Sequence, residues 1–193
     1  MNPGYAKAVV LIGVILLIAI PAAIHHRDGK AGVDKSRRGS LELVVLAIAW
    51  LGFLPSIAWL ATPLLGFADY PPHMVPFLAG IACLAAGLWL LYRSHADLGE
   101  SWSITLELHA DHRLVTRGVY RSVRHPMYLA LLLYAMGQAL VLPNWVAGPA
   151  YLVAMAILFA LRVGPEERMM LESFGKDYEA YVARTSRLVP GVW

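Results

Sequence analysis

The sequence predicts an all-α polytopic membrane protein with about five transmembrane helices, and three observations carry this prediction. Of the 193 residues, 59% are hydrophobic and 15% are charged, whereas soluble domains are about 45–50% apolar and about 25% charged. Five apolar runs approach the roughly 20 residues that a helix needs to cross a bilayer. Basic residues gather in alternate connections between these runs, as they do in proteins that the positive-inside rule orients.

The apolar runs cover residues 8–24, 41–65, 74–92, 127–142 and 145–161. The first is longer than the apolar core of a signal peptide and no strong small-x-small site follows it, so we expect a retained helix. The last two are short and separated only by Pro143-Asn144, a turn signal that predicts a helical hairpin. After the hairpin, residues 166–183 show apolar and aromatic side chains at helical spacing, interrupted at Gly175. They predict two short amphipathic helices on the cytoplasmic side.

The connections decide the predicted topology. Five basic residues lie between the first two runs, the next connection has no Lys or Arg, residues 93–124 hold five arginines, and the tail is again rich in charge. We therefore expect the N-terminus outside and the C-terminus in the cytoplasm. The net charge of +3 is explained by these loops, and we predict no nucleic-acid partner.

The chain divides near residue 92. Residues 1–92 form three transmembrane helices with a basic cytoplasmic loop. Residues 93–193 form the half that carries the chemistry, with a connector, the hairpin and a C-terminal segment. Within the connector, residues 98–103 and 104–108 predict short interfacial pieces because they are too polar to span.

The first polar cluster is Arg124-His125-Pro126. Proline is favoured in the first turn of a helix, so Pro126 predicts the start of the fourth membrane helix and His125 falls near its N-cap. The free N–H groups there, strengthened by Arg124, would bind an anion. The alternative is that Arg124 and Arg121 only anchor the helix to anionic headgroups.

The second cluster runs from Arg162 to Glu167, where the fifth apolar run ends. If the hairpin is antiparallel, the two clusters meet at the same level. A corner with an anion site, a histidine, tyrosines and a carboxylate pair would suit a small zwitterion. Alternatively, Glu166 and Glu167 are the solvated first turn of a cytoplasmic helix, where they favour its dipole.

An ordered set of motifs then indicates a family. It consists of Gly118-Val119-Tyr120, Arg124-His125-Pro126-Met127-Tyr128, the cluster at residues 162–167, and Phe174-Gly175-x-x-Tyr178-x-x-Tyr181. With His112-Arg113-Leu114-Val115 and the closing Arg187-Leu188-Val189-Pro190, this set resembles the isoprenylcysteine carboxyl methyltransferase family, which is related to phospholipid N-methyltransferases. The resemblance covers roughly residues 95–193.

The resemblance implies S-adenosyl-L-methionine as methyl donor, in a pocket that the C-terminal segment closes, and a lipophilic acceptor such as the carboxylate of a prenylated cysteine or a related lipidic molecule. Arg162 matches the catalytic arginine that faces the acceptor. Glu167 and Glu107 lie close to matched positions without matching them. The residues matched to cofactor contacts are His112, Arg113, Leu114, Val115, Tyr120, His125, Pro126, Met127, Tyr128 and Glu166.

Three alternatives stay open at this point. An amine or thiol acceptor would need a general base, for which His125 or Glu167 would serve. A membrane reductase with a nicotinamide cofactor could use a similar hairpin, and a small non-enzymatic transporter is the third reading. We predict no metal site, because His25-His26 and His109-x-x-His112 are the only close histidine pairs and no cysteine accompanies them.

Overall fold

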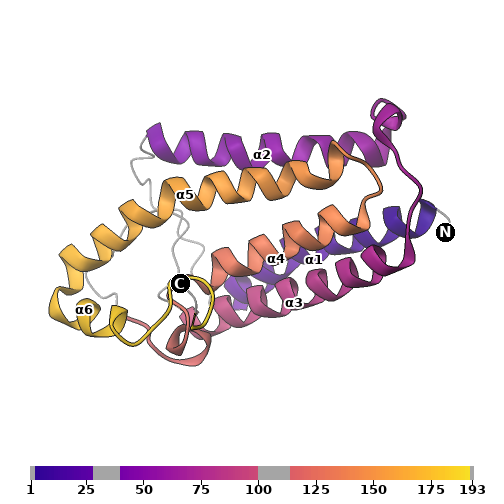
Figure 1. Cartoon of the computed structure of the whole chain (residues 1–193). Helices are drawn as coiled ribbons and strands as arrows, with labels where there is room; N and C mark the ends of the chain where they lie inside the picture. The colour runs from indigo at the N-terminus through magenta and orange to yellow at the C-terminus, as the bar shows by residue number, and fades with distance from the viewer. Residues whose placement is uncertain (1–2, 28–39, 100–113, 192–193) are drawn as a thin grey trace.

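The computed structural model describes residues 3–27, 40–99 and 114–191. The described chain is all-α, as predicted (Figure 1). Its elements are α1 (Pro3–Arg27), α2 (Ser40–Ala61), η1 (Gly66–Ala68), α3 (Met74–Leu98), η3 (Gly118–Arg121), α4 (Pro126–Val141), α5 (Ala147–Phe174) and α6 (Lys176–Val182).

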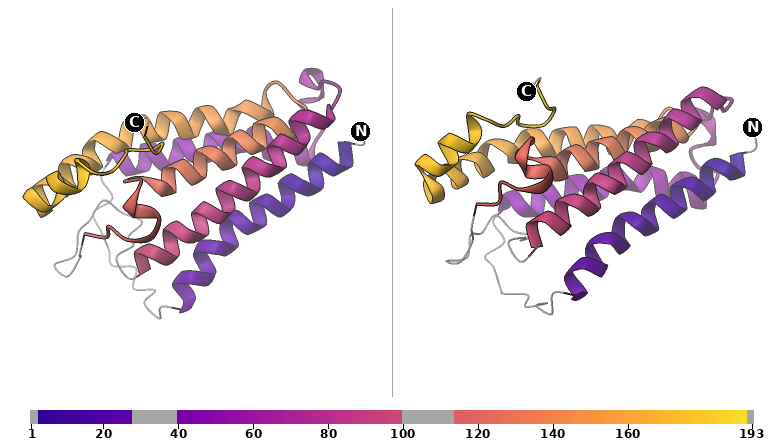
Figure 2. Two further views of the ribbon diagram at one scale, coloured as in Figure 1. Left: turned by 60° about the horizontal axis from the view of Figure 1, so that its bottom comes forward. Right: turned by 90° about the horizontal axis from the view of Figure 1, so that it is seen from below.

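The long helices form a bundle in which α4 is the central element. It packs against α3 on one side and α5 on the other, while α2 lies along α5 and α1 lies along α3 (Figures 1 and 2). The N-terminus and η1 lie at one end of the bundle, and α6 with the C-terminal segment at the other (Figure 2). The polar clusters of the sequence therefore share one end of the molecule.

Within the described residues, four helices are long and apolar enough to cross a membrane, namely Gly4–Ile24, Leu43–Ala61, Met74–Leu98 and Ala147–Phe174, and α4 is a shorter apolar helix. Large apolar side chains on the outer surface of α1, such as Leu11, Ile12 and Ile15, are more than half exposed, which suits contact with lipid. The protein is a multi-pass integral membrane protein, and the prediction of about five membrane helices is confirmed.

Helices α3 and α4 approach so closely that glycine is required between them. A Cβ atom on Gly87 would lie 2.7 Å from Tyr134 N, and one on Gly137 would lie 2.6 Å from Leu84 N. Small residues allow such backbone contact between membrane helices, where van der Waals packing drives association. These glycines set the height of α4 along α3.

The turn between α4 and α5 is held by Asn144. Its Oδ1 accepts hydrogen bonds from Val146 N at 3.0 Å and Ala147 N at 2.7 Å, and so satisfies free donors at the start of α5. Its Nδ2 donates to Asp69 Oδ1 at 2.7 Å, and Trp59 Nε1 donates to the same oxygen at 2.6 Å. The predicted turn at Pro143-Asn144 is thus confirmed, with its polar groups paired.

Helix α5 differs from the sequence-based expectation. We expected the fifth membrane run to end at residue 161, with two further short helices, but α5 continues unbroken through Pro165 to Phe174. Its 28 residues span about 42 Å, more than the roughly 30 Å of a bilayer core, so its polar last turns extend beyond the apolar part without a break. The interruption at Gly175 is confirmed, since this glycine has a φ of 49°, which favours glycine.

Helix α3 likewise continues to Leu98, past the predicted end at residue 92. The expected interfacial pieces of the connector lie largely outside the described residues.

Substituting Gly137 tests the helix contact. We expect Gly137→Ala to lower the free energy of unfolding by about 1–3 kcal/mol, because the added Cβ overpacks a backbone contact. Gly164→Ala on α5 is the control, since no atom lies within 4 Å of its Cβ position and alanine favours the helix. Thermal denaturation in detergent measures both, and equal melting temperatures for the two variants would contradict the packing assignment.

Candidate functional site

The start of α4 forms the first wall of a polar corner. Pro126 is in the first turn and His125 is the N-cap, with Leu129 N donating to His125 O at 3.2 Å, as the sequence predicts. No side chain of the described residues caps the helix at His125. Both residues are buried.

The C-terminal segment, residues 183–191, runs beside the chain that leads into α4 (Figure 2). Arg124 N donates to Ser186 O at 2.9 Å, Ser186 N donates to Ser122 O at 3.1 Å, and His125 N donates to Arg187 O at 3.1 Å. These bonds resemble one short parallel pairing of strands. They hold the C-terminal segment against residues 122–125, directly before α4.

Glu167, from the extended part of α5, lies at the centre of this corner. Arg124 Nε donates to its Oε1 at 3.1 Å, and His125 Nε2 lies 3.3 Å from the same oxygen. Arg187 donates from Nε to Oε1 at 3.1 Å and from Nη2 to Oε2 at 2.6 Å. Arg124 also donates to the carbonyl oxygens of Val182 and Thr185. Arg124 therefore has internal partners, where the sequence predicted a contribution to an anion site.

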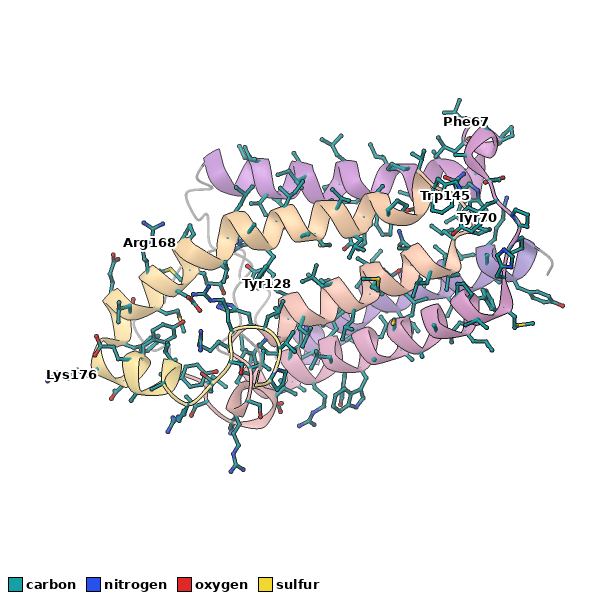
Figure 3. The ribbon with its side chains drawn as sticks, viewed as in Figure 1. Phe67, Tyr70, Tyr128, Trp145, Arg168 and Lys176 are labelled. Atoms are coloured by element: carbon teal, nitrogen blue, oxygen red, sulfur yellow. The ribbon has the colours of Figure 1, made fainter. Side chains whose placement is uncertain are left out.

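Glu166 takes part in a separate contact. Tyr128 OH donates to Glu166 Oε2 at 2.7 Å, and Tyr128 lies between α5 and the start of α4 (Figure 3). Arg162 precedes Glu166 by one helical turn and shares its face of α5. The Nε of Arg162 is buried and has no hydrogen-bond partner among the described residues. A buried guanidinium N–H without a partner is costly, and an anionic ligand would satisfy it.

Aromatic rings border the same place. The rings of Tyr128 and Phe159 are 5.4 Å apart between centroids, and those of His125 and Tyr128 are 5.7 Å apart. Ring faces attract cations more strongly where water is excluded. The corner can therefore hold both charges of a zwitterion, with an aromatic wall between them.

Tyr120 is positioned from two other elements. Val119 N donates to Asp97 Oδ2 at 2.9 Å, and Tyr181 OH donates to Tyr120 O at 2.6 Å. Burial raises the pKa of Tyr120 and raises that of Tyr181 to about 12, so both hydroxyls stay protonated at neutral pH. Asp97 was not among the residues predicted from the sequence. The available signals were its i,i+4 spacing from Arg93, with which it forms an ion pair at 3.0 Å, and the glycine at 118.

The remaining predicted cofactor contacts fall into two groups. Leu114, Val115 and Met127 are half-buried, the first two on irregular chain before η3 and the third in the first turn of α4. His112 and Arg113 lie outside the described residues, and so does Glu107, which was only close to a matched position.

A groove of about 420 Å³ lies between the end of α5 and α6. Among its lining residues only Glu167 also belongs to the polar corner, and none is a predicted cofactor contact. Its lining consists of Gly164, Glu167, Arg168, Leu171, Tyr178, Glu179, Val182 and Ala183. Over the described residues, no group of three or more His, Cys, Asp or Glu side chains is placed to hold a metal ion.

Comparison with known proteins identifies the family of this arrangement. The family model for phospholipid methyltransferases matches residues 75–177. A probable protein-S-isoprenylcysteine O-methyltransferase of Oryza sativa subsp. indica is 32% identical over 131 residues, which are 67% of this chain and 69% of the relative. The chain belongs to the isoprenylcysteine carboxyl methyltransferase family.

Two further comparisons define how far the similarity extends. The protein-S-isoprenylcysteine O-methyltransferase of Schizosaccharomyces pombe is 27% identical over 129 residues, which are 63% of this chain and 55% of the yeast protein. The structure of a eukaryotic intramembrane Ras methyltransferase, an isoprenylcysteine carboxyl methyltransferase, superposes with a TM-score of 0.65 at 21% identity, covering 100% of this chain and 69% of that one. The similarity thus covers a little over half of the yeast protein and about two thirds of the solved structure. The fold of that structure is shared along the whole of this chain.

Proposed function

We propose that the protein is an integral membrane methyltransferase that uses S-adenosyl-L-methionine and methylates the carboxylate of a lipophilic acceptor, of which a prenylated cysteine is the representative. The single observation that carries the proposal is the pair on one face of α5. Arg162 has a buried Nε without a partner among the described residues, one turn before Glu166, whose carboxylate is held by Tyr128. Family membership supports the same function.

The residues of the corner fit the proposed donor, which carries an ammonium, a sulfonium and a carboxylate. Glu166 has one oxygen bonded to Tyr128 and a second that accepts no hydrogen bond from the described residues, so it can receive an ammonium. The rings of Tyr128 and Phe159 can face a sulfonium. The uncapped start of α4 at His125 offers N–H groups to a carboxylate.

When bound, S-adenosyl-L-methionine supplies an electrophilic methyl group, whose transfer to a carboxylate oxygen yields a methyl ester and a neutral thioether without moving a proton. The protein therefore needs no general base for this acceptor. Arg162 orients the acceptor carboxylate, for which a planar guanidinium is well suited. Correct alignment of the reactants contributes on the order of 7–11 kcal/mol to such a step.

The charge of Arg162 favours a carboxylate over the amine of a phospholipid headgroup. A guanidinium attracts an anionic acceptor and repels an ammonium ion at short range. An acceptor with a long apolar chain can remain in the bilayer beside α4 and α5 while its polar end reaches Arg162. The acceptor is thus expected to be a lipid or lipidated molecule that ends in a carboxylate.

Product binding provides the first test. We expect S-adenosylhomocysteine to bind the purified, folded protein and to raise its melting temperature, as linkage requires. Calorimetry and thermal denaturation in detergent measure this, with adenosine alone as the control ligand. Methyl transfer is then assayed with an N-acetylated S-prenylcysteine and, separately, with phosphatidylethanolamine. Folded protein that binds no S-adenosylhomocysteine at millimolar concentration would refute the proposed function.

Two substitutions on α5 should impair the protein in different ways, one in ligand binding and the other in methyl transfer. Glu166→Gln removes the charge that would face the ammonium, which costs on the order of 2–5 kcal/mol in a desolvated site, so S-adenosylhomocysteine should bind at least tenfold more weakly. Arg162→Gln should leave that affinity nearly unchanged and abolish methyl transfer, because the acceptor is no longer aligned. Arg168→Gln, an exposed charge on the same helix, is the control. If Arg162→Gln weakens product binding as much as Glu166→Gln, the division of the pocket is wrong.

We further propose that the end of the bundle with α6 faces the cytoplasm. Phe67 on η1 and Lys176 on α6 lie at opposite ends of the molecule (Figure 3). In a Cys83→Ser background, a cysteine introduced at Phe67 should react with an impermeant maleimide on intact cells, and one at Lys176 should react only after lysis. Reaction of the cysteine at Lys176 on intact cells would show that the α6 end of the bundle faces the outside.

A further inference from the structure

We propose that Glu167 is a positioning residue that holds residues 183–191 closed against the start of α4, and that it is not a ligand of the cofactor. The Glu167 cluster consists of Glu167, Arg124, His125 and Arg187. The consequence for cofactor binding rests on the proposed function, whereas the consequence for the C-terminal segment does not.

The carboxylate of Glu167 has cationic partners on both of its oxygens. Three contacts of 3.1–3.3 Å, from Arg124, His125 and Arg187, reach Oε1, and Arg187 Nη2 donates to Oε2 at 2.6 Å. Its side chain is only 16% exposed. By contrast, Glu166 accepts one hydrogen bond among the described residues. The structure thus assigns the internal role to Glu167 and the ligand role to Glu166.

The C-terminal segment depends on this cluster because it buries little. None of residues 183–191 is buried, and none belongs to a helix of the bundle. Three backbone hydrogen bonds connect it to residues 122–125. The side chains of Arg124 and Arg187 add contacts between the segment and the corner, through Thr185 and Glu167 respectively.

Neutralising Glu167 would do more than remove hydrogen bonds. Arg124 and Arg187 both approach its Oε1 at 3.1 Å, so without the anion two guanidinium groups would face one another. Their repulsion in a partly desolvated corner favours release of the segment. The backbone bonds at Ser186 and Arg187 would then open.

Release of the segment would affect cofactor affinity more than the chemical step. His125 is the N-cap of α4 and contacts both Glu167 and Arg187 O, so the segment orders one wall of the site. If only a fraction of the protein is closed, the apparent affinity falls by that fraction. Saturating cofactor closes the segment again, and turnover recovers because Arg162 and Glu166 are unchanged.

The test compares Glu167→Gln, Arg187→Gln and the double variant, with Glu172→Gln, an exposed carboxylate on α5, as the control. Arg187→Lys tests rescue by a conserved charge. Hydrogen exchange at the amides of Arg124, His125 and Ser186 reports closure without any ligand. Calorimetry with S-adenosylhomocysteine and turnover at saturating S-adenosyl-L-methionine with the S-prenylcysteine acceptor report the functional consequence.

We expect both single variants to speed exchange at these amides by roughly tenfold or more and to weaken S-adenosylhomocysteine binding by a similar factor, as the lost closed fraction requires. Turnover at saturating cofactor should stay within about twofold of the parent protein. The double variant should bind S-adenosylhomocysteine no more weakly than Glu167→Gln, because the two changes remove the same ion pair. For Arg187→Lys, both the exchange rate and the affinity should lie between those of Arg187→Gln and those of the parent protein.

Other outcomes would overturn the proposal. Unchanged exchange in Glu167→Gln would show that the cluster does not hold the segment. Weaker binding in Glu167→Gln with normal binding in Arg187→Gln would make Glu167 a direct cofactor ligand, and lost turnover at saturation would place it in the chemical step. If the parent protein binds no S-adenosylhomocysteine, the proposed function fails, while the exchange measurements still decide the role of Glu167.

Discussion

Helix α4 has 16 residues and lies between α3 and α5, and the position of the candidate site follows from how those neighbours hold it. At about 24 Å it is shorter than the roughly 30 Å of a bilayer core. Glycine contacts with α3 set its height, and the Asn144 turn sets its register with α5. Together they bring Tyr128 to Glu166 and His125 to Glu167. The polar start of α4 is then covered by the C-terminal segment.

The two ends of the bundle use polar residues in different ways. At the η1 end, Asn144 and Trp59 both donate to Asp69 Oδ1, and the side-chain oxygen of Asn144 accepts from the backbone of α5. Such pairing stabilises a turn and leaves little for a ligand. At the α6 end, the buried Nε of Arg162 has no partner among the described residues. A buried polar group without a partner calls for an explanation, and the proposed carboxylate acceptor supplies one for Arg162.

Adjacent glutamates on α5 illustrate how a helix separates two tasks. Successive residues point about 100° apart around a helix, so Glu166 faces Tyr128 while Glu167 faces Arg124 and Arg187. One carboxylate can remain available to a ligand while its neighbour fixes the chain that covers the site. The same geometry explains why Arg162 and Glu166, four residues apart, share a face.

The membrane-spanning helices could be predicted from the sequence alone, because hydropathy is a local property that the bilayer selects. It also predicted the start of α4 at Pro126, the turn at Pro143-Asn144 and the break at Gly175, since proline and glycine act through their own backbone geometry. It did not predict that α5 continues through Pro165, because the polar turns beyond the bilayer are held by packing against α6.

Which of the two glutamates is bound by internal partners depends on the packing of the whole fold. The partners of Glu167 come from residues 124, 125 and 187, which are distant in the chain and meet only when α4, α5 and the C-terminal segment pack together. Neighbouring carboxylates are chemically identical in the sequence. The fold makes them different, because it places Arg124 and Arg187 at Glu167 and the Tyr128 hydroxyl at Glu166.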